Sequence, residues 1–394
     1  MALSTGADVL AWLDFGPLHG RRVGLVANQT STTSDGRHLF DLLATDPNVD
    51  LRTVFAPEHG VRGRAAPGAE IGDFIDTFTG VPVRSLYDTT RAPTGSELAE
   101  LDVLVYDLQD AGTRFYTFIS TMGLAMAAAA DAGIEFVVLD RPNPLGDGVA
   151  GFTRTPDQVS FVSSYPIPTT YGMTAGELAR MIADQGLVDG RVLPEPTVIE
   201  LVGWNRAEPW SALDRPWVAP SPGLPTEDAI LTYPATVWFE ATTLSFGKGT
   251  VRPFNVIGAP WINGPQLAGD LNDLGLAGVR FEAATFTPDP AIDPDPRWAN
   301  QGLSGIEVVV TDPTTTPPTE LGVHLLVALR EHAAGQGVGQ IIDRPAFFDL
   351  LAGTSQLRQM LNDGSTAVEI IEAWQRDVAA FEAARAPYLL YDAD

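Results

Sequence analysis

The most chemically suggestive stretch of the chain is a loop in which a glutamate and a histidine directly follow an apolar run. Residues 51–56 form the strand-like run, Pro57 ends it, and Glu58 and His59 come next, with two glycines in the following four residues. Strands that stop in glycine-rich loops place side chains at the carboxyl edge of a sheet, where open α/β folds bind ligands. We therefore take Glu58 as the first candidate for a catalytic acid or base. The alternative is that Glu58 only caps the next turn.

Two further strand ends carry polar groups. The apolar runs 101–107 and 136–139 are typical of buried strands, and they lead into the loops 107–116 and 140–144. A strand is also predicted at residues 22–28 and a helix at 38–44, and this alternation indicates a parallel sheet covered by helices. Loops at the carboxyl ends of neighbouring parallel strands share one edge of the sheet. We expect them to converge on one cleft, although each could instead hold a cap or a salt bridge.

The second half of the chain shows a different order of predicted strands and helices. Residues 235–242 are predicted to form a strand that carries Glu240, and a capping box at Thr174 predicts a helix up to about Asp184. Beyond residue 240 we predict a second α/β domain, with its segments in the following order: strands at 254–262, 279–285 and 305–311, helices at 265–274 and 318–332, and helical pieces over 344–386. The loop 204–225 contains three tryptophans. Their rings could stack on sugar faces, or they could anchor a long loop to the protein body.

Composition restricts the chemistry and the partners. The formal net charge is −26 over 394 residues, so nucleic acid and anionic membranes would be repelled, and we expect neither as a partner. The chain has no cysteine, which excludes disulfides, thiolate metal sites and cysteine nucleophiles. The five histidines form no HxxxH or HxH pair, so we expect no metal and no cofactor. The N-terminus has neither a basic leader nor a long apolar run, which predicts a cytoplasmic protein unless a leader was removed.

Carboxylate chemistry is what remains. The candidates at strand ends or in loops are Glu58, Asp107, Asp110, Asp140 and Glu240. Glycoside hydrolysis uses an acid to protonate the leaving oxygen and usually a second carboxylate as nucleophile or base. The acid must keep its proton near neutral pH, which requires an apolar or acidic environment. Phe55, Pro57 and nearby aspartates could provide that environment for Glu58.

Ordered sequence blocks along the chain resemble the NamZ family of bacterial exo-β-N-acetylmuramidases, long catalogued as a domain of unknown function. The blocks are Val26–Ser31, Phe55–Gly60, Tyr106–Asp110, Arg114–Thr117, Leu139–Pro144, Tyr171–Leu178, Pro220–Pro222, Glu240–Phe254 and Gly258–Trp261. The resemblance implies a Rossmann-like larger domain over residues 1–240, a smaller C-terminal α/β domain over 241–394, and an active cleft between them. It also implies release of terminal N-acetylmuramic acid from the non-reducing end of peptidoglycan fragments.

The resemblance extends to individual residues. It implies that Glu58 is catalytic, in agreement with the choice made from the residues, and we add Glu240 and Asp107 as further catalytic candidates. The expected substrate-binding residues are His59, Asn28, Gln109, Asp110, Arg114, Tyr116, Arg141, Asn143, Tyr171, Lys248 and Arg252. Arg114 could pair with the lactyl carboxylate of muramic acid, or could form a salt bridge with Asp107 or Asp110.

The chain departs from the family pattern at four positions, where Thr170, Ala241, Thr243 and Lys248 stand. These departures bear on which sugar is accepted more than on the fold. We therefore predict an exo-acting glycoside hydrolase with Glu58 as general acid, which acts on a peptidoglycan-derived saccharide as a monomer or homodimer. The alternatives are an exo-glycosidase for another amino sugar and a non-catalytic muropeptide-binding protein.

Overall fold

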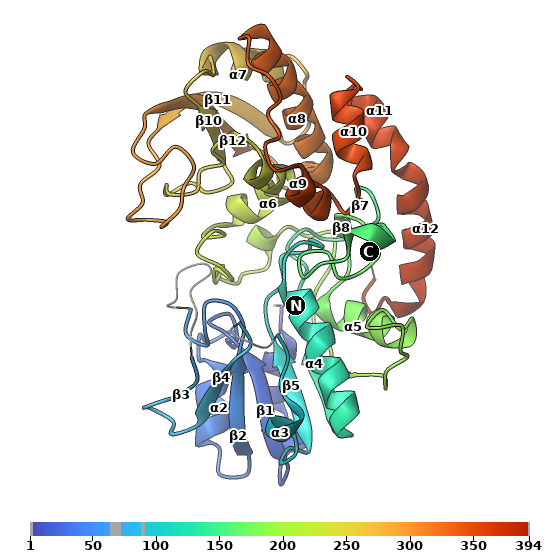
Figure 1. Ribbon diagram of the computed structural model, residues 1–394. Helices are drawn as coiled ribbons and strands as arrows, with labels where there is room; N and C mark the ends of the chain where they lie inside the picture. Colours follow the sequence, from blue (N-terminus) through green and yellow to red (C-terminus); the bar gives the residue numbers. More distant parts are fainter. Residues whose placement is uncertain (1–2, 64–71, 88–90, 393–394) are drawn as a thin grey trace.

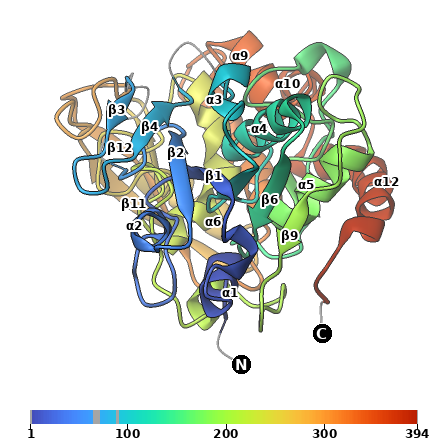
Figure 2. The same ribbon diagram turned by 90° about the horizontal axis from the view of Figure 1, so that it is seen from below.

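The larger sheet positions the loops singled out above. In the computed structural model, which describes residues 3–63, 72–87 and 91–392, this sheet has seven strands in the order β3-β4-β2-β1-β5-β6-β9 (Figures 1 and 2). All neighbouring pairs are parallel except β3 with β4. The strands are β1 (Arg22–Ala27), β2 (Asp50–Ala56), β3 (Phe74–Ile75), β4 (Pro82–Ser85), β5 (Val103–Asp107), β6 (Glu135–Leu139) and β9 (Thr197–Ile199). The predicted parallel α/β fold is confirmed.

Helices cover both faces of this sheet. On one face lie α1 (Gly6–Trp12) and α2 (Leu39–Thr45), whose apolar side chains pack on alternate residues of β1, β2 and β5. On the other face lie α3 (Gly95–Leu98), α4 (Phe118–Ala132) and α5 (Ala175–Asp184). Because both faces are covered, every residue of β5 is buried, which explains the uninterrupted apolar run in the sequence. The predicted capping box at Thr174 and Glu177 is confirmed at the start of α5.

A smaller antiparallel sheet forms the second lobe, in the upper part of Figure 1. Its order is β10-β12-β11, and its strands are β10 (Val256–Ala259), β11 (Val279–Phe286) and β12 (Leu303–Val310). The helices α7 (Gly264–Asn272) and α8 (Pro318–Gly335) accompany it, as predicted. A two-stranded ribbon, β7 (Val149–Ala150) with β8 (Thr170–Tyr171), lies apart from both sheets.

The C-terminal helices return from the second lobe to the first. They are α9 (Pro345–Ala352), α10 (Gln356–Asn362), α11 (Ala367–Ala373) and α12 (Gln375–Arg385), and α12 ends near α5 in Figure 1. Arg180 on α5 donates a hydrogen bond to the Tyr388 carbonyl at 3.2 Å, and the Tyr391 hydroxyl donates to Asp140 at 2.7 Å. The end of the chain is thus tied to the larger sheet.

The predicted strand at residues 235–242 is wrong. This segment is the end of α6 (Glu227–Thr236) followed by the 3₁₀ helix η4 (Val237–Ala241). Val237, Trp238 and Phe239 are all buried, so the segment shows the continuous apolar run of a buried strand although it is helical. Periodicity cannot distinguish these two cases when every face of a short element is covered.

Candidate active site

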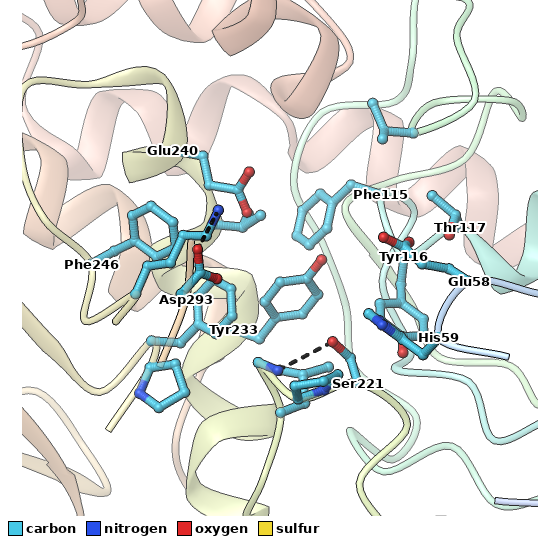
Figure 3. A pocket seen from close by; sticks show the side chains of 18 of the residues that line it. Glu58, His59, Phe115, Tyr116, Thr117, Ser221, Tyr233, Glu240, Phe246 and Asp293 are labelled. Carbon is cyan, nitrogen blue, oxygen red and sulfur yellow. Dashed lines mark hydrogen bonds and ion pairs between the residues drawn. The ribbon is translucent and has the colours of Figure 1, made fainter. Parts of the chain in front are cut away.

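A cavity of about 310 Å³ is lined by residues from both lobes (Figure 3). The loop after β2, the segment leading into α4, the helices α6 and η4, the turn near residue 248 and the helix α9 all contribute to it. Its charged lining residues within the described chain are Glu58, Glu240, Lys248 and Asp293, and its aromatic lining includes Phe115, Tyr116, Tyr233 and Phe246. A pocket with two glutamates and several aromatic rings can hold and protonate a sugar.

Glu58 reaches the cavity because β2 ends two residues earlier. After Ala56 the backbone turns through Glu58 into two left-handed residues, His59 at φ 72° and Gly60 at φ 74°. A left-handed histidine is a strained conformation that surrounding structure must hold in place. The turn buries His59 and leaves Glu58 half-buried at the cavity wall. Burial raises the pKa of Tyr87, and the neighbouring Glu58 carboxylate raises it further.

Glu240 lies across the cavity from Glu58 in Figure 3, on η4. The element is fixed by the Thr236 hydroxyl, which donates to the Phe254 carbonyl at 3.0 Å. Burial raises the pKa of Glu240 to about 7, and the charges of Glu58 and Asp293 act in the same direction. Lys248 and Arg344 oppose this shift. Glu240 therefore keeps its proton to a higher pH than an ordinary glutamate does.

Two tyrosines stand near the two glutamates. Burial raises the pKa of Tyr233, and the charges of both Glu240 and Glu58 add to the effect. The Tyr116 hydroxyl has no hydrogen-bond partner within the described residues, although it is buried. Figure 3 shows Tyr116 beside Glu58. A buried hydroxyl without a protein partner is available to a bound ligand.

The structure places five of the predicted site residues in the cavity wall: Glu58, His59, Tyr116, Glu240 and Lys248. Nine others are not among the lining residues, namely Asn28, Asp107, Gln109, Asp110, Arg114, Arg141, Asn143, Tyr171 and Arg252. These nine make hydrogen bonds or ion pairs with the protein itself.

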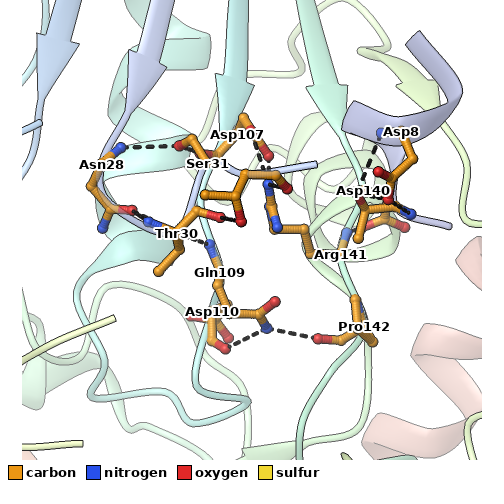
Figure 4. Close-up of polar contacts among 12 residues, drawn as sticks. Asp8, Asn28, Thr30, Ser31, Asp107, Gln109, Asp110, Asp140, Arg141 and Pro142 are labelled. Carbon is orange, nitrogen blue, oxygen red and sulfur yellow. Dashed lines mark hydrogen bonds and ion pairs between the residues drawn. The ribbon is translucent and has the colours of Figure 1, made fainter. Parts of the chain in front are cut away.

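One buried ion pair joins the ends of β5 and β6 (Figure 4). Arg141 donates to both carboxylate oxygens of Asp107, at 2.6 and 3.0 Å, and both side chains are almost completely buried. The loops after β5 and β6 therefore meet each other, but no residue of 140–144 lines the cavity, so the predicted convergence of all three loops on one cleft is wrong. Both oxygens of Asp107 accept from Arg141, and Asp107 is not among the residues that line the cavity.

Other predicted residues join loops in the same way. Asn28 accepts hydrogen bonds from the backbone and hydroxyl of Thr30 at 2.9 and 2.6 Å, and the Gln109 amide donates to the Pro142 carbonyl at 2.8 Å. Asp110 accepts from the Tyr171 hydroxyl and from the Gly112 backbone, and burial raises its pKa to about 6. These hydrogen bonds hold together the loops that follow the strands of the larger sheet.

Three residues that were predicted to bind the substrate contact other parts of the protein instead. The Arg114 guanidinium donates to the carbonyls of Phe152, Ile167 and Leu351 at 2.8 to 3.0 Å, rather than pairing with Asp107 or Asp110. The Asn143 amide donates to the Met173 carbonyl at 3.0 Å. Arg252 pairs with Glu307 on β12.

The tryptophan-rich loop anchors itself to the protein. The indoles of Trp210 and Trp217 donate to the carbonyls of Arg215 and Leu224 at 3.1 and 2.9 Å, and their rings pack edge to face at 4.8 Å. Neither these rings nor Trp204 line the cavity. Of the two readings of this loop, the structure supports the anchoring one.

Comparison with known proteins agrees with this architecture. Residues 23–228 match the N-terminal family model of exo-β-N-acetylmuramidase NamZ, and residues 231–391 match the C-terminal model. The chain belongs to the NamZ family. A curated relative, the peptidoglycan β-N-acetylmuramidase NamZ of Bacillus subtilis (strain 168), is 38% identical over 99% of this chain and 91% of its own length.

Two solved structures share the fold of this NamZ-family chain. Both are DUF1343 family proteins from Bacteroides fragilis NCTC 9343. The first has a TM-score of 0.89 at 33% identity and covers 99% of each chain. The second has a TM-score of 0.81 at 31% identity and covers 100% of each chain.

Sequence reasoning missed several lining residues of this site. Tyr233 carries no motif signal, Phe246 lies inside the block Glu240–Phe254 but was not selected as a site residue, and Asp293 lies in a loop rich in aspartate and proline. Asp293 lies between β11 and β12, in the segment 287–302, and irregular loops of this length inside a compact domain are often functional, so that signal could have led to Asp293. Within the described residues, no group of three or more His, Asp or Glu side chains is arranged to hold a metal ion.

Proposed function

We propose that this chain is an exo-β-N-acetylmuramidase that releases N-acetylmuramic acid from the non-reducing end of peptidoglycan fragments. The observation that carries this proposal is the pair of glutamates, Glu58 and Glu240, on opposite walls of a cavity in a chain of the NamZ family. The activity named for the Bacillus subtilis relative supports the choice of sugar.

Glu240 has the environment of a general acid. Its pKa of about 7 leaves much of it protonated at neutral pH, whereas an ordinary glutamate would have lost its proton. The sequence suggested Glu58 for this role, but the environment of Glu240 is the better match. We assign proton donation to the glycosidic oxygen to Glu240 and assign Glu58 as the second carboxylate.

Cleavage then follows from these two positions. The Glu240 proton moves to the bridging oxygen as the bond from that oxygen to the anomeric carbon breaks. Positive charge develops at the anomeric carbon, and the Glu58 carboxylate stabilises it. Water supplies a hydroxyl group to that carbon and returns a proton to the site. The aromatic rings of Phe115, Tyr233 and Phe246 offer apolar faces against which a pyranose can pack.

The experiment compares two substrates that differ in their leaving groups. The first is the disaccharide of N-acetylmuramic acid linked β-1,4 to N-acetylglucosamine, whose leaving oxygen needs a proton. The second is a nitrophenyl β-N-acetylmuramide, whose leaving group departs without one. We expect Glu240→Gln to lose at least ~10² in kcat/KM on the disaccharide and much less on the nitrophenyl glycoside. Glu58→Gln loses activity on both substrates.

The matched control is Asp228→Asn on α6, an exposed carboxylate at the start of the helix that leads to Glu240. It should retain wild-type rates on both substrates. If instead Glu58→Gln loses activity on the disaccharide but not on the nitrophenyl glycoside, Glu58 is the proton donor and Glu240 the second carboxylate, and the proposed enzyme activity stands. Hydrolysis of a nitrophenyl glucosaminide without any muramide hydrolysis would indicate another amino-sugar glycosidase. Tight muropeptide binding without turnover would indicate a binding protein.

A further inference from the structure

The cation of the cavity is already paired. Lys248 is the only lysine or arginine among the described residues that line the cavity, and its ammonium lies 3.3 Å from Oδ1 of Asp293. The Lys248 side chain is about one-third exposed at 36%, whereas that of Asp293 is 12% exposed. An ammonium in a sugar cavity is the natural partner of a carboxylate substituent on that sugar. Asp293 forms an ion pair with this ammonium from within the protein.

The backbone holds Asp293 in this position. Its Oδ1 also accepts a hydrogen bond from the Asp295 backbone at 3.1 Å, which closes a tight turn within the loop 287–296. The Asp289 backbone donates to the Gly249 carbonyl at 2.8 Å, next to Lys248. Gly249 has φ 79°, and a Cβ there would come within 2.8 Å of Pro296. The loop and the Lys248 turn are therefore held together, which places Asp293 beside Lys248.

We propose that Asp293 is a specificity-determining residue, which limits the affinity of the cavity for carboxylate-bearing sugars by competing for Lys248. An incoming carboxylate must share the ammonium with Asp293 and meets the negative charges of Asp293 and Glu58. A neutral sugar neither competes for the ammonium nor is repelled by these negative charges. This inference rests on the proposed function, in which the accepted sugar bears a lactyl carboxylate.

The same group is present before and after the reaction. Substrate and released N-acetylmuramic acid both carry the lactyl carboxylate, so competition from Asp293 weakens both complexes. The expected consequence is easier release of the product, in exchange for a higher KM. Asp293 acts through Lys248 and takes no part in proton transfer.

The test measures ligand binding by calorimetry and needs no turnover. The ligands are N-acetylmuramic acid, its neutral carboxamide and N-acetylglucosamine. Asp293→Asn removes the charge but keeps an oxygen that can accept the Asp295 hydrogen bond, so the loop remains closed. We expect this variant to bind N-acetylmuramic acid about three- to tenfold more tightly, with the two neutral ligands unchanged within about twofold.

Two further variants make the result specific. Asp295→Asn removes the same charge from an exposed position in the same loop and should change none of the three affinities. Lys248→Met should bind N-acetylmuramic acid and its carboxamide about equally, and adding Asp293→Asn to it should then give no gain of more than about twofold. Lys248→Arg should restore the preference for the carboxylate.

Other results would overturn the inference. Equal changes for the acid and the carboxamide in Asp293→Asn would mean that Asp293 only shapes the loop. Weaker binding of the acid would mean that Asp293 positions Lys248 instead of competing for it. If muramide hydrolysis is absent while the affinities shift as expected, the proposed function fails and the role of Asp293 stands.

Discussion

The cavity and the strand-end network below it contain the same kinds of polar residue, but they differ in what satisfies them. In the network, both oxygens of Asp107 accept from Arg141 and the side-chain oxygen of Asn28 accepts from Thr30, so its main polar contacts are made within the protein, although the Asn28 Nδ2 has no partner among the described residues. In the cavity, Glu240 is held in an environment that disfavours its charge, and the Tyr116 hydroxyl has no partner within the described chain. The comparison shows that the residue type does not tell a structural polar group near a sheet edge from one that faces the cavity. The partners of each group do.

The largest expected effect is on the scaffold. Arg141→Met leaves the Asp107 carboxylate buried without its partner, and we expect it to lower the free energy of unfolding by about 3–5 kcal/mol. Chemical denaturation measures the loss, and kcat of the remaining folded protein should stay close to the wild-type value. The double variant Arg141→Met, Asp107→Leu should recover part of the stability. A single variant as stable as the wild type would place Arg141 with the cavity residues.

The second prediction concerns the pH dependence of catalysis. A general acid must be protonated, so kcat/KM should fall as the pH rises through about 7, the pKa of Glu240, by about tenfold per unit beyond it. Lys248 lowers this pKa and Asp293 raises it. Lys248→Met should therefore move the alkaline limb to higher pH, and Asp293→Asn should move it to lower pH. If the alkaline limb of the pH profile has the same position in both variants, a group other than Glu240 causes it.

The third prediction concerns stability in the same pH range. Because the folded pKa of Glu240 lies above its unfolded value, its contribution to stability is fully present below the unfolded pKa and is lost as the pH rises through about 7. We expect Glu240→Gln to gain roughly 2–3 kcal/mol relative to the wild type between pH 5 and pH 8, since each unit of pKa shift corresponds to about 1.4 kcal/mol. Denaturation curves at both pH values measure this difference. Parallel curves for the two proteins would argue against a half-buried Glu240 that keeps its proton to a higher pH than an ordinary glutamate.

The smallest effect is expected at Tyr116. Since its hydroxyl has no partner among the described residues, Tyr116→Phe should leave the melting temperature unchanged. If substrate supplies the missing hydrogen bond, KM should rise about threefold, which corresponds to the lower range of a neutral hydrogen bond. Tyr171→Phe is the matched comparison, because its hydroxyl donates to Asp110 inside the scaffold. That variant should lower stability and leave KM unchanged. If Tyr116→Phe lowered stability and Tyr171→Phe raised KM, Tyr116 would be the structural residue and Tyr171 the ligand-binding one.

Sequence reasoning succeeded where local pattern and topology carry the information. The apolar runs of β1, β2, β5 and β6 predicted a parallel sheet, and the loop after β2 pointed to Glu58. It failed at the helical segment 237–241, because complete burial removes the periodicity that separates a helix from a strand. It also selected Asp107 and Arg114, since spacing along the chain does not show which charged groups neutralise or bury one another.

By itself the sequence determined the family, the α/β sheet and the loop that carries Glu58, because these depend on residue order and on the pattern of apolar segments. Only the tertiary structure decided which carboxylates face the cavity. Glu58 and Glu240 are far apart in sequence and meet because the chain crosses between two lobes, while Asp107 is withdrawn by its pairing with Arg141. The proton affinity of Glu240 likewise depends on burial and on Lys248, Arg344, Glu58 and Asp293, and folding alone brings these groups to it.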